Sequence, residues 1–529
     1  MVNFFVGKKR SVGITSIVPR DLLIMPHMPP GYVELEYYNV EPGYSAVKIY
    51  RDEGGFGDIV YWVIEPILTL KEQKELEFYI KKLMTRLPEK ITFQEDVNLE
   101  LKRKRLREYI LEDMISRGYS KRSGEKIFYE LYKKYLAFGP LTVPIKDKNN
   151  IEDITVTRNK VYIYHKKYGS IRTNINFIND DNSEKLLRKI TEISGKHISY
   201  VEPIVDSSLP DGSRIQATIS SDVVITGPAL SVRKFTEKPF TPVDLIRSNT
   251  SSSEIYAYLW LAVQYFANFM IIGGTATGKT TMLNSILMFA KPFAKIVSIE
   301  DTRELNLYHE NWIPAVTRGA VGIINPYGIY EKVGEITMMD LVKNVLRQRP
   351  EYLVVGEVRG QEAAYMFQAL ATGKTGYTTF HAEDVESAVK RLTEPPLNIP
   401  KNQIANIDIF IVLKHTIKDN MPVRRVYEVD EYYFDKNYER MNLNPYFQWD
   451  SLSDTFKIGI ESYILRKISE VHGIDLDYLK FEFKKRVEFL DEMVRSGEAF
   501  DVISFTTKIF KYYSGESERQ KEYERSKEL

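Results

Sequence analysis

The stretch Gly273-Gly-Thr-Ala-Thr-Gly-Lys-Thr280 decides the fold of the central part of this chain. It matches the pattern G-x-x-x-x-G-K-[ST], and it lies between an apolar run at 269–272 and a helix-like run that begins at Thr281. Glycines in this pattern let successive backbone N–H groups surround a phosphate, and the N-terminus of the following helix adds positive potential. The sequence therefore predicts a buried strand, a phosphate-binding loop and a helix, in that order.

The residues of this loop are the predicted nucleotide-binding residues. We expect Lys279 to reach the β- and γ-phosphates and the hydroxyl of Thr280 to ligate Mg²⁺. The predicted cofactors are accordingly ATP and Mg²⁺. The predicted binding residues are Gly273, Gly274, Thr275, Ala276, Thr277, Gly278, Lys279, Thr280 and Thr281.

Two acidic residues follow strand-like apolar runs further along the chain. Glu300 ends the run that begins at Ile296, and Glu357 follows the run that begins at Tyr352. Because the carboxyl ends of parallel strands form the ligand crevice of an open α/β sheet, we expect both carboxylates beside the phosphate loop. Hydrolysis needs one group to orient or deprotonate water and another to hold magnesium, and we assign Glu300 and Glu357 these roles. The alternative for each is a solvated carboxylate that ends a strand.

A lone histidine, His381, ends a third strand-like run, which begins after Thr372. Single histidines are more often structural than catalytic. The position of His381 after the second acidic strand nevertheless favours a role as a sensor of the γ-phosphate.

The 529-residue length predicts three or four domains, and the pattern of elements predicts the α/β class. Short Val/Ile-rich strands alternate with helical stretches between about 252 and 415, which is typical of a parallel sheet with crossover helices. The predicted parts are a β-strand and helical partner-binding region at 1–136, which forms an N-terminal α/β cap, an α+β domain at 137–240, a linker at 241–251, the P-loop domain with a β-rich extension at 252–460, C-terminal helices at 461–513 and a charged, disordered tail at 514–529.

Composition and charge narrow the class of protein. The chain has 73 basic and 72 acidic residues and no cysteine, so disulfides and thiolate metal sites are excluded and no basic nucleic-acid-binding signature is present. No nucleic-acid partner is expected. The first ten residues lack the apolar core of a signal peptide, which predicts a cytoplasmic location.

The run at 255–272 has eighteen residues without a charge, which is nominally enough for a membrane span. Gln264 and Asn268 interrupt it, and the phosphate loop needs a strand directly before it. We therefore predict a helix that ends near Gln264 and a strand that begins near Phe269.

The order of these motifs resembles the type II/type IV secretion ATPase superfamily, which arranges a Walker A loop, an acidic box, a Walker B element and a histidine box. The resemblance covers residues 130–450 and implies a RecA-like P-loop motor domain with a parallel sheet, preceded by an α+β amino-terminal domain. It also implies that Glu300 is the catalytic base, that Glu357 lies near magnesium and that His381 lies near the nucleotide.

The segments Phe138-Gly-Pro-Leu, Ile151-Glu-Asp-Ile and Leu209-Pro-Asp-Gly-Ser-Arg resemble the family's amino-terminal domain. In the family, arginines from this domain complete the nucleotide site, and Arg214 and Arg233 match them best. A guanidinium fork suits this role because it can grip a phosphate through two hydrogen bonds. The alternative for each arginine is an ion pair with a local carboxylate.

The segments at 231–235 and 346–350 and the carboxy-terminal extension resemble the archaeal branch of the family, which holds pilus-assembly and archaellum motors. The resemblance implies a homo-hexamer that couples ATP hydrolysis to work on a polytopic membrane platform protein, and indirectly on pilin-like subunits. Such a motor is peripheral at the inner face of the cell membrane. The alternatives are an archaellum assembly or rotation motor, a DNA-transfer ATPase of the conjugation type, and a nucleotide-binding scaffold with little hydrolysis.

Two residues depart from the family pattern. Lys374 stands where the histidine box usually begins with Thr-Gly-His, and Gly360 replaces an acid that follows the Walker B element in many bacterial members. We expect Lys374, as a fixed charge, to alter γ-phosphate sensing. The stretch at 318–334 differs from the family's compact loop, and we predict that it contacts a specific partner.

Overall fold

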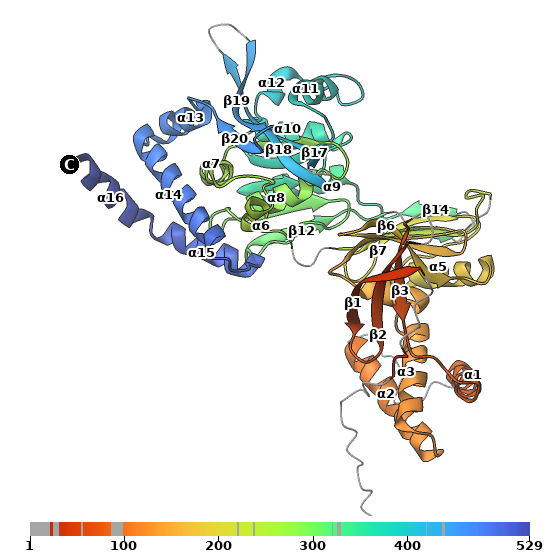
Figure 1. Cartoon of the computed structure of the whole chain (residues 1–529). Helices are drawn as coiled ribbons and strands as arrows, with labels where there is room; N and C mark the ends of the chain where they lie inside the picture. Colours follow the sequence, from red (N-terminus) through yellow and green to blue (C-terminus); the bar gives the residue numbers. More distant parts are fainter. Residues whose placement is uncertain are drawn as a thin grey trace, which may run out of the picture. The chain divides into compact units, whose positions relative to one another are not determined.

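The computed structural model of the chain describes residues 22–24, 31–53, 57–85, 99–219, 222–235, 239–319, 321–324, 330–418, 421–435 and 440–528. The prediction made from the first ten residues lies outside these ranges. The chain divides into two compact units, Met1–Phe235 and Thr236–Leu529, which we call the first and the second unit (Figure 1).

One nine-stranded sheet organises the first unit. Only β3 and β6 pair in parallel, and the other neighbours are antiparallel. The sheet joins the strands before residue 66 to those after residue 150, so the predicted boundary between 136 and 137 falls inside a single unit. Its order is β1 (Tyr32–Glu41), β2 (Ser45–Asp52), β3 (Ile59–Ile64), β6 (Gly169–Asn176), β5 (Lys160–His165), β4 (Ile151–Thr157), β9 (Ala229–Arg233), β8 (Arg214–Thr218) and β7 (Ile204–Ser208).

The helices of the first unit pack in two groups. One apolar cluster lies between the sheet and α4 and α5, and a second cluster holds α1, α2 and α3 together. Lys189 of α5 joins the groups, because its ammonium donates to the carbonyls of Lys133, Lys134 and Ala137 at the end of α3, and burial lowers its pKa to about 8. The helices are α1 (Leu70–Thr85), α2 (Leu99–Ser116), α3 (Lys121–Tyr135), η2 (Gly139–Leu141), α4 (Thr142–Lys146) and α5 (Asp180–Ile193).

A second nine-stranded sheet organises the second unit. Six neighbouring strands, β12, β11, β15, β16, β10 and β17, pair in parallel, as predicted. Strands β18, β19 and β20 continue the sheet beyond β17 as antiparallel neighbours. The sheet is therefore mixed. Its order is β12 (Trp312–Val316), β11 (Ile296–Glu300), β15 (Tyr352–Val355), β16 (Thr375–Phe380), β10 (Phe269–Gly273), β17 (Ile409–Lys418), β18 (Met421–Asp435), β19 (Arg440–Asp450) and β20 (Thr455–Ile458); the stretch at 318–334 contains a separate hairpin of β13 (Val321–Ile324) and β14 (Tyr330–Val333).

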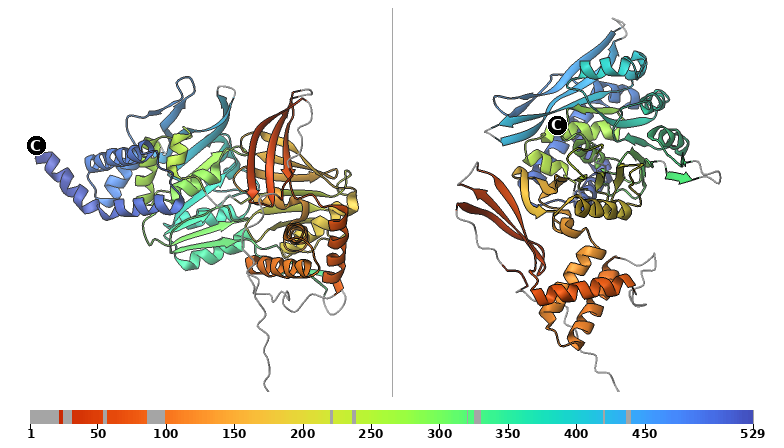
Figure 2. Two further views of the ribbon diagram at one scale, coloured as in Figure 1. Left: turned by 60° about the horizontal axis from the view of Figure 1, so that its bottom comes forward. Right: turned by 90° about the vertical axis from the view of Figure 1, so that its right-hand side faces the viewer.

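Alternate residues of β10 belong to two apolar clusters, one on each face of this sheet. Phe269 and Ile271 pack with α7, α8 and the C-terminal helices, whereas Met270 and Ile272 pack with α9 to α12. Helices α13 to α16 follow one another at the C-terminal end of the unit (Figures 1 and 2). The helices are α6 (Pro242–Arg247), α7 (Ser253–Gln264), α8 (Lys279–Leu287), α9 (Met338–Val345), η3 (Leu346–Gln348), α10 (Glu362–Ala371), α11 (Val385–Thr393), α12 (Lys401–Ile404), α13 (Tyr463–His472), α14 (Leu476–Arg495), α15 (Val502–Ser514) and α16 (Glu516–Glu528).

The uncharged run at 255–272 divides as predicted. Helix α7 ends at Gln264, β10 begins at Phe269, and the residues of α7 are buried between the sheet and α14. Ser252 caps α7 by accepting a hydrogen bond from the amide of Ile255. Within the described ranges, no helix has both the length and the apolar character that a membrane crossing requires.

The prediction of a disordered tail was wrong for residues 516–528, which form α16. Arg519 donates to the buried Glu482 of α14 at 2.7 Å, and Glu522 lies 2.8 Å from the ammonium of Lys485. The tail has little apolar surface, so its composition alone suggests disorder. These charge pairs with α14 supply the partners that composition does not reveal.

Candidate active site

The phosphate loop connects β10 to α8 within six residues, and its backbone explains two of its glycines. Gly278 has φ +93°, a conformation that glycine adopts without strain. A Cβ on Gly273 would lie 2.6 Å from the carbonyl oxygen of Leu413 and equally close to the hydroxyl of Thr277, so no side chain fits there. The hydroxyl of Thr277 donates to the carbonyl of Gly274 at 3.0 Å, which closes the turn.

Lys279 is the first residue of α8, and its ammonium lies over the loop. It donates to the carbonyls of Gly273 at 3.0 Å and Gly274 at 2.8 Å. Burial lowers the pKa of Lys279 from its usual value, although Glu357 opposes this effect. The loop carbonyls therefore hold the ammonium where the motif places the β- and γ-phosphates.

The structure brings Lys279, His381 and Glu357 together from three elements. The Nδ1 atom of His381 lies 3.4 Å from the Lys279 ammonium, and its Nε2 atom lies 2.8 Å from Glu357 Oε1. Since the ammonium can only donate, this arrangement requires the tautomer that carries its proton on Nε2. Burial and then the charge of Lys279 lower the pKa of His381, which favours the neutral ring. Glu357 also pairs with Arg359.

Glu300 ends β11, and its side chain is buried. Its Oε1 accepts hydrogen bonds from the amides of Glu304 at 2.9 Å and Leu305 at 3.0 Å, while its Oε2 has no hydrogen-bond partner among the described residues. Burial raises the pKa of Glu300 to about 7 despite the two amide donors. A carboxylate with this pKa can accept a proton near neutral pH, which is what a general base must do.

Gly356 lets Glu300 lie against the strand end that carries Glu357. A Cβ at Gly356 would approach the Glu300 side chain to 3.1 Å, and the Gly356 amide donates to the carbonyl of Ile299 at 2.8 Å. The predicted convergence of both acids at the carboxyl ends of neighbouring strands is thus what the geometry shows.

Two supporting residues were missed by the sequence analysis. Asn284 of α8 accepts the amide of Asn306 at 2.8 Å and so ties the loop after Glu300 to the helix that follows the phosphate loop. Arg424 of β18 donates through Nε to the carbonyl of Ala276 at 2.9 Å. Arg424 comes from far along the sequence, whereas Asn284 follows the phosphate loop closely and its partner Asn306 lies beyond the next strand. Neither contact can be read from a local motif.

The structure shows where the two departures from the family pattern lie. Lys374 precedes β16, whereas His381 follows it, so at about 3.3 Å per residue they lie roughly 20 Å apart at opposite ends of the strand. The position of Lys374 in the chain therefore does not support the expectation that it alters γ-phosphate sensing, which stays a prediction. At Gly360, the carboxylate of Glu362 accepts the amides of Arg359 and Gly360, each at 2.6 Å.

The predicted arginines belong to the first unit, where Arg214 of β8 and Arg233 of β9 are cross-strand neighbours. Arg214 donates two hydrogen bonds to Asp206, at 2.7 and 3.2 Å, and Arg233 Nε lies 3.4 Å from Asp153 Oδ1. Both arginines thus make the local ion pairs that were the alternative to nucleotide binding. Their role toward the nucleotide stays a prediction.

The residues at the loop fit a magnesium ion that is held mainly by the nucleotide. The described ranges contain no group of three or more His, Asp or Glu side chains arranged to hold a metal by themselves. Mg²⁺ in nucleotide sites commonly uses one or two protein oxygens together with phosphate oxygens and water. The Thr280 hydroxyl and the Glu357 carboxylate are the oxygens that these residues offer.

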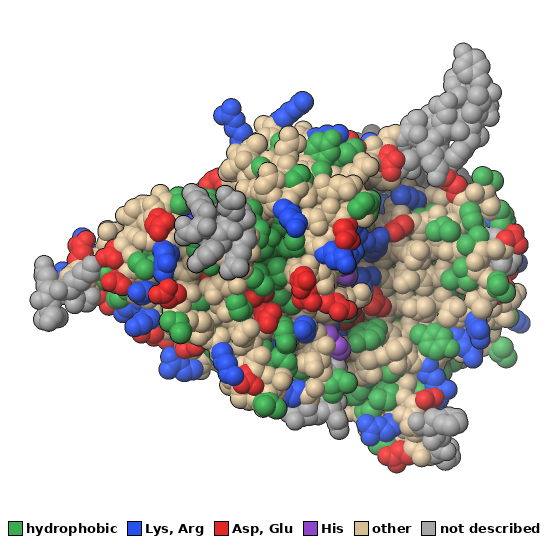
Figure 3. All heavy atoms as spheres, turned by 90° about the horizontal axis from the view of Figure 1, so that it is seen from above, with side chains coloured by type: hydrophobic (Ala, Val, Ile, Leu, Met, Phe, Trp, Pro, Cys, Tyr) green, Lys and Arg blue, Asp and Glu red, His purple; other side chains and the backbone are tan. Residues whose placement is uncertain are grey.

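The charged surface is mixed in sign. On the face shown in Figure 3, Lys and Arg side chains are interspersed with Asp and Glu side chains, and histidine side chains lie among them. This agrees with the near-equal numbers of basic and acidic residues in the sequence.

Comparison with known proteins agrees with the order of motifs. A family model described as "Type II/IV secretion system protein" matches residues 139–432, which is more than half of the chain. An uncharacterised protein of Methanocaldococcus jannaschii is 36% identical over 397 residues, covering 74% of this chain and 70% of that protein. A second uncharacterised protein of the same organism is 42% identical, covering 51% of this chain and 97% of that protein.

Among solved structures, the VirB11 ATPase of the Brucella suis type IV secretion system matches with 21% identity and a TM-score of 0.27, covering 55% of this chain and 91% of that one. The family model and the relatives of M. jannaschii carry the assignment. The chain belongs to the type II/IV secretion system family of ATPases.

Proposed function

We propose that this chain is a homo-hexameric, Mg-ATP-hydrolysing motor that powers assembly of an archaeal type IV pilus-like filament or secretion across the cytoplasmic membrane. The observation that carries the proposal is Glu300, a buried carboxylate with a pKa near 7 and one oxygen without a partner, held beside the strand end of Glu357. A scaffold that only binds nucleotide has no need of such a base.

In this proposal, Glu300 takes a proton from the water that attacks the γ-phosphorus, while the bond from that phosphorus to the bridging oxygen of ADP breaks. Lys279 exchanges the carbonyls of Gly273 and Gly274 for phosphate oxygens and offsets the charge that develops on them. His381, whose Nε2 faces Glu357 and whose Nδ1 faces Lys279, positions both of these groups on the side of the γ-phosphate. When bound, Mg²⁺ would neutralise phosphate charge, with Thr280 and Glu357 as its protein ligands.

The finer parts of the proposal rest on family membership, and the uncharacterised M. jannaschii relatives support only the archaeal setting. They are the hexamer, the polytopic membrane platform protein as partner, and a location at the inner face of the membrane. Crosslinking in cells should capture a polytopic membrane protein on this chain, whereas recovery of DNA-processing proteins instead would favour the conjugation alternative.

Hydrolysis of ATP by the full chain with magnesium tests the core of the proposal. We expect turnover by an assembly of six chains, lost in Lys279→Ala and in Glu300→Gln, with Glu300→Gln still binding ATP because its amide keeps the shape of the site. Lys374→Ala is the matched control, since this lysine lies at the far end of β16 and its loss should leave turnover unchanged. ATP binding without turnover in the wild type would contradict the motor and favour a scaffold.

A further inference from the structure

Arg424 approaches the phosphate loop from the side of the sheet opposite to the acidic residues. Gly273 at the end of β10 pairs with Leu413 of β17, and His415, two residues further, pairs with Arg424 of β18. Arg424 is therefore level with the loop and two strands away from β10. Glu300, Glu357 and His381 follow β11, β15 and β16, which lie on the other side of β10 in the strand order.

The side chain of Arg424 is exposed and directed at the loop. Its Nε donates to the carbonyl of Ala276 at 2.9 Å, and its Cδ lies 3.5 Å from the position that a Cβ of Gly278 would take. Within the part of the chain that the structure describes, neither Nη atom of Arg424 makes a hydrogen bond or an ion pair. Both NH2 groups of the guanidinium, which carry four N–H donors, thus remain available beside the loop.

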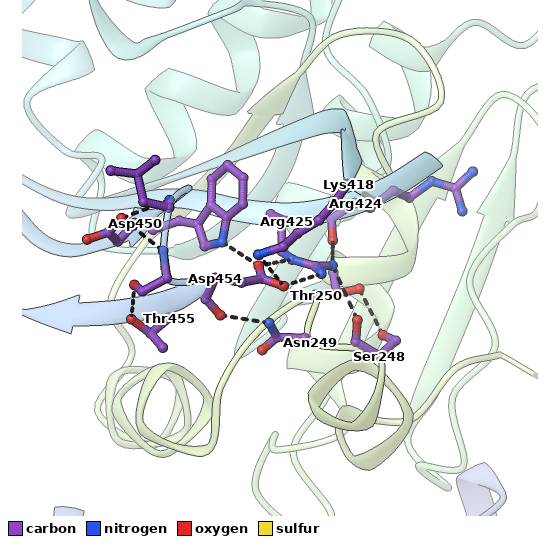
Figure 4. A network of polar contacts seen from close by, with 12 residues as sticks. Ser248, Asn249, Thr250, Lys418, Arg424, Arg425, Asp450, Asp454 and Thr455 are labelled. Carbon is purple, nitrogen blue, oxygen red and sulfur yellow. Dashed lines mark hydrogen bonds and ion pairs between the residues drawn. The ribbon is translucent and has the colours of Figure 1, made fainter. Parts of the chain in front are cut away.

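The neighbouring arginine fixes the backbone from which Arg424 extends. Arg425 is buried, binds both carboxylate oxygens of Asp454 at 2.9 and 3.0 Å, and donates to the main-chain carbonyls of Arg424 and Ser248 at 2.9 and 3.3 Å (Figure 4). In Figure 4 the two arginine side chains point apart, with Arg425 inside the polar network and Arg424 directed away from it.

The strand order decides which end of a nucleotide Arg424 meets. The γ-phosphate has to lie near Glu300 and His381, on the side of β11, β15 and β16, and the β-phosphate lies in the loop. An extended nucleoside triphosphate then directs its ribose and base toward β17 and β18. A guanidinium there can stack on the base and donate to ribose oxygens.

We propose that Arg424 binds the nucleoside end of the nucleotide: its Nε holds the loop at Ala276, and its Nη atoms contact the ribose and base. This inference rests on the proposed function, because it requires the loop to bind a nucleoside triphosphate.

Equilibrium binding of ATP, ADP and inorganic tripolyphosphate to the full chain tests the inference. We expect Arg424→Ala to weaken the binding of ATP and ADP by about tenfold, which is the scale of one desolvated cation–π or charged hydrogen-bond contact. The affinity for tripolyphosphate should stay within about twofold of the wild-type value. Arg424→Lys should recover only part of the ATP affinity, because lysine keeps the charge and loses the planar fork. His415→Ala, the exposed register neighbour, is the matched control and should bind all three ligands as the wild type does.

Several results would overturn the inference. Equal weakening of ATP and tripolyphosphate binding in Arg424→Ala would limit the residue to loop support or phosphate contact, and unchanged ATP affinity would show no contact with the nucleoside. Thermal unfolding without nucleotide, expected to match the wild type, verifies that Arg424→Ala folds. A wild type that binds neither ATP nor tripolyphosphate would instead refute the proposed function, so the two failures are distinguishable.

Discussion

At the scale of single residues, the same burial that makes Glu300 a suitable base also makes it costly to ionise. Its carboxylate has two amide donors on one oxygen, yet desolvation outweighs them and raises the pKa to about 7. Strongly shifted groups in proteins gather at functional sites, and this one lies at the strand end that the sequence predicted.

The pH dependence of turnover follows from this pKa. Glu300 accepts a proton only when it is ionised, so kcat at saturating ATP should rise with pH through about 7 and at pH 6 reach roughly a tenth of its plateau. Burial lowers the pKa of His381, which moves its titration away from the rise expected for Glu300. Steady-state hydrolysis from pH 5.5 to 9 measures the curve, and a flat profile between pH 6 and 8 would rule out Glu300 as the base. Glu300→Asp provides the control, because any residual turnover should keep an alkaline rise.

At the scale of elements, the sequence predicted the helices, strands and loops that depend on a local pattern of residues. The phosphate loop, the end of α7 near Gln264 and the start of β10 at Phe269 depend on neighbours in the chain, and the structure confirms them. Helix α16 and the placement of Arg424 depend on partners far along the chain, such as Glu482 for Arg519 and Ala276 for Arg424. A sequence without an alignment does not reveal such pairs.

Helix α16 should therefore depend on Arg519. Its guanidinium donates to Glu482, which is almost fully buried and also pairs with Arg486. We expect Arg519→Ala to reduce the free energy of unfolding of the C-terminal helices by about 2–3 kcal/mol, because it leaves Glu482 with less charge compensation. Urea unfolding and the rate of tryptic cleavage within α16 are the measurements. Lys521→Ala, an exposed change on the same helix, should alter stability by less than about 0.5 kcal/mol, and an equal effect of both variants would contradict this account.

At the scale of the whole molecule, each unit has its own apolar clusters. The two clusters of the second unit draw only on residues between 243 and 513, and those of the first unit only on residues between 22 and 232. The phosphate loop, both acids and the histidine all belong to the second unit, while Arg214 and Arg233 belong to the first.

The second unit should consequently fold and bind nucleotide by itself. We expect a fragment of residues 239–529 to unfold cooperatively and to bind ATP through Lys279, since its core and its loop are complete. Its turnover should be far below that of the full chain if Arg214 and Arg233 contribute to the site, as the family resemblance implies. Calorimetric unfolding and ATP titration test the first part, and a fragment without a cooperative transition would disprove it. Full turnover by the fragment would remove the two arginines from the mechanism.

The adjacent placement of Arg424 and Arg425 on β18 constrains the register of this hairpin. Neighbouring residues of a strand point to opposite faces, so sliding β18 by one residue against β17 would exchange their directions. The phosphate loop would then lose its contact at Ala276 and Asp454 would lose its bidentate partner in one event. Insertions and deletions in this hairpin should therefore fall outside the paired residues, where they leave the register of the two strands unchanged.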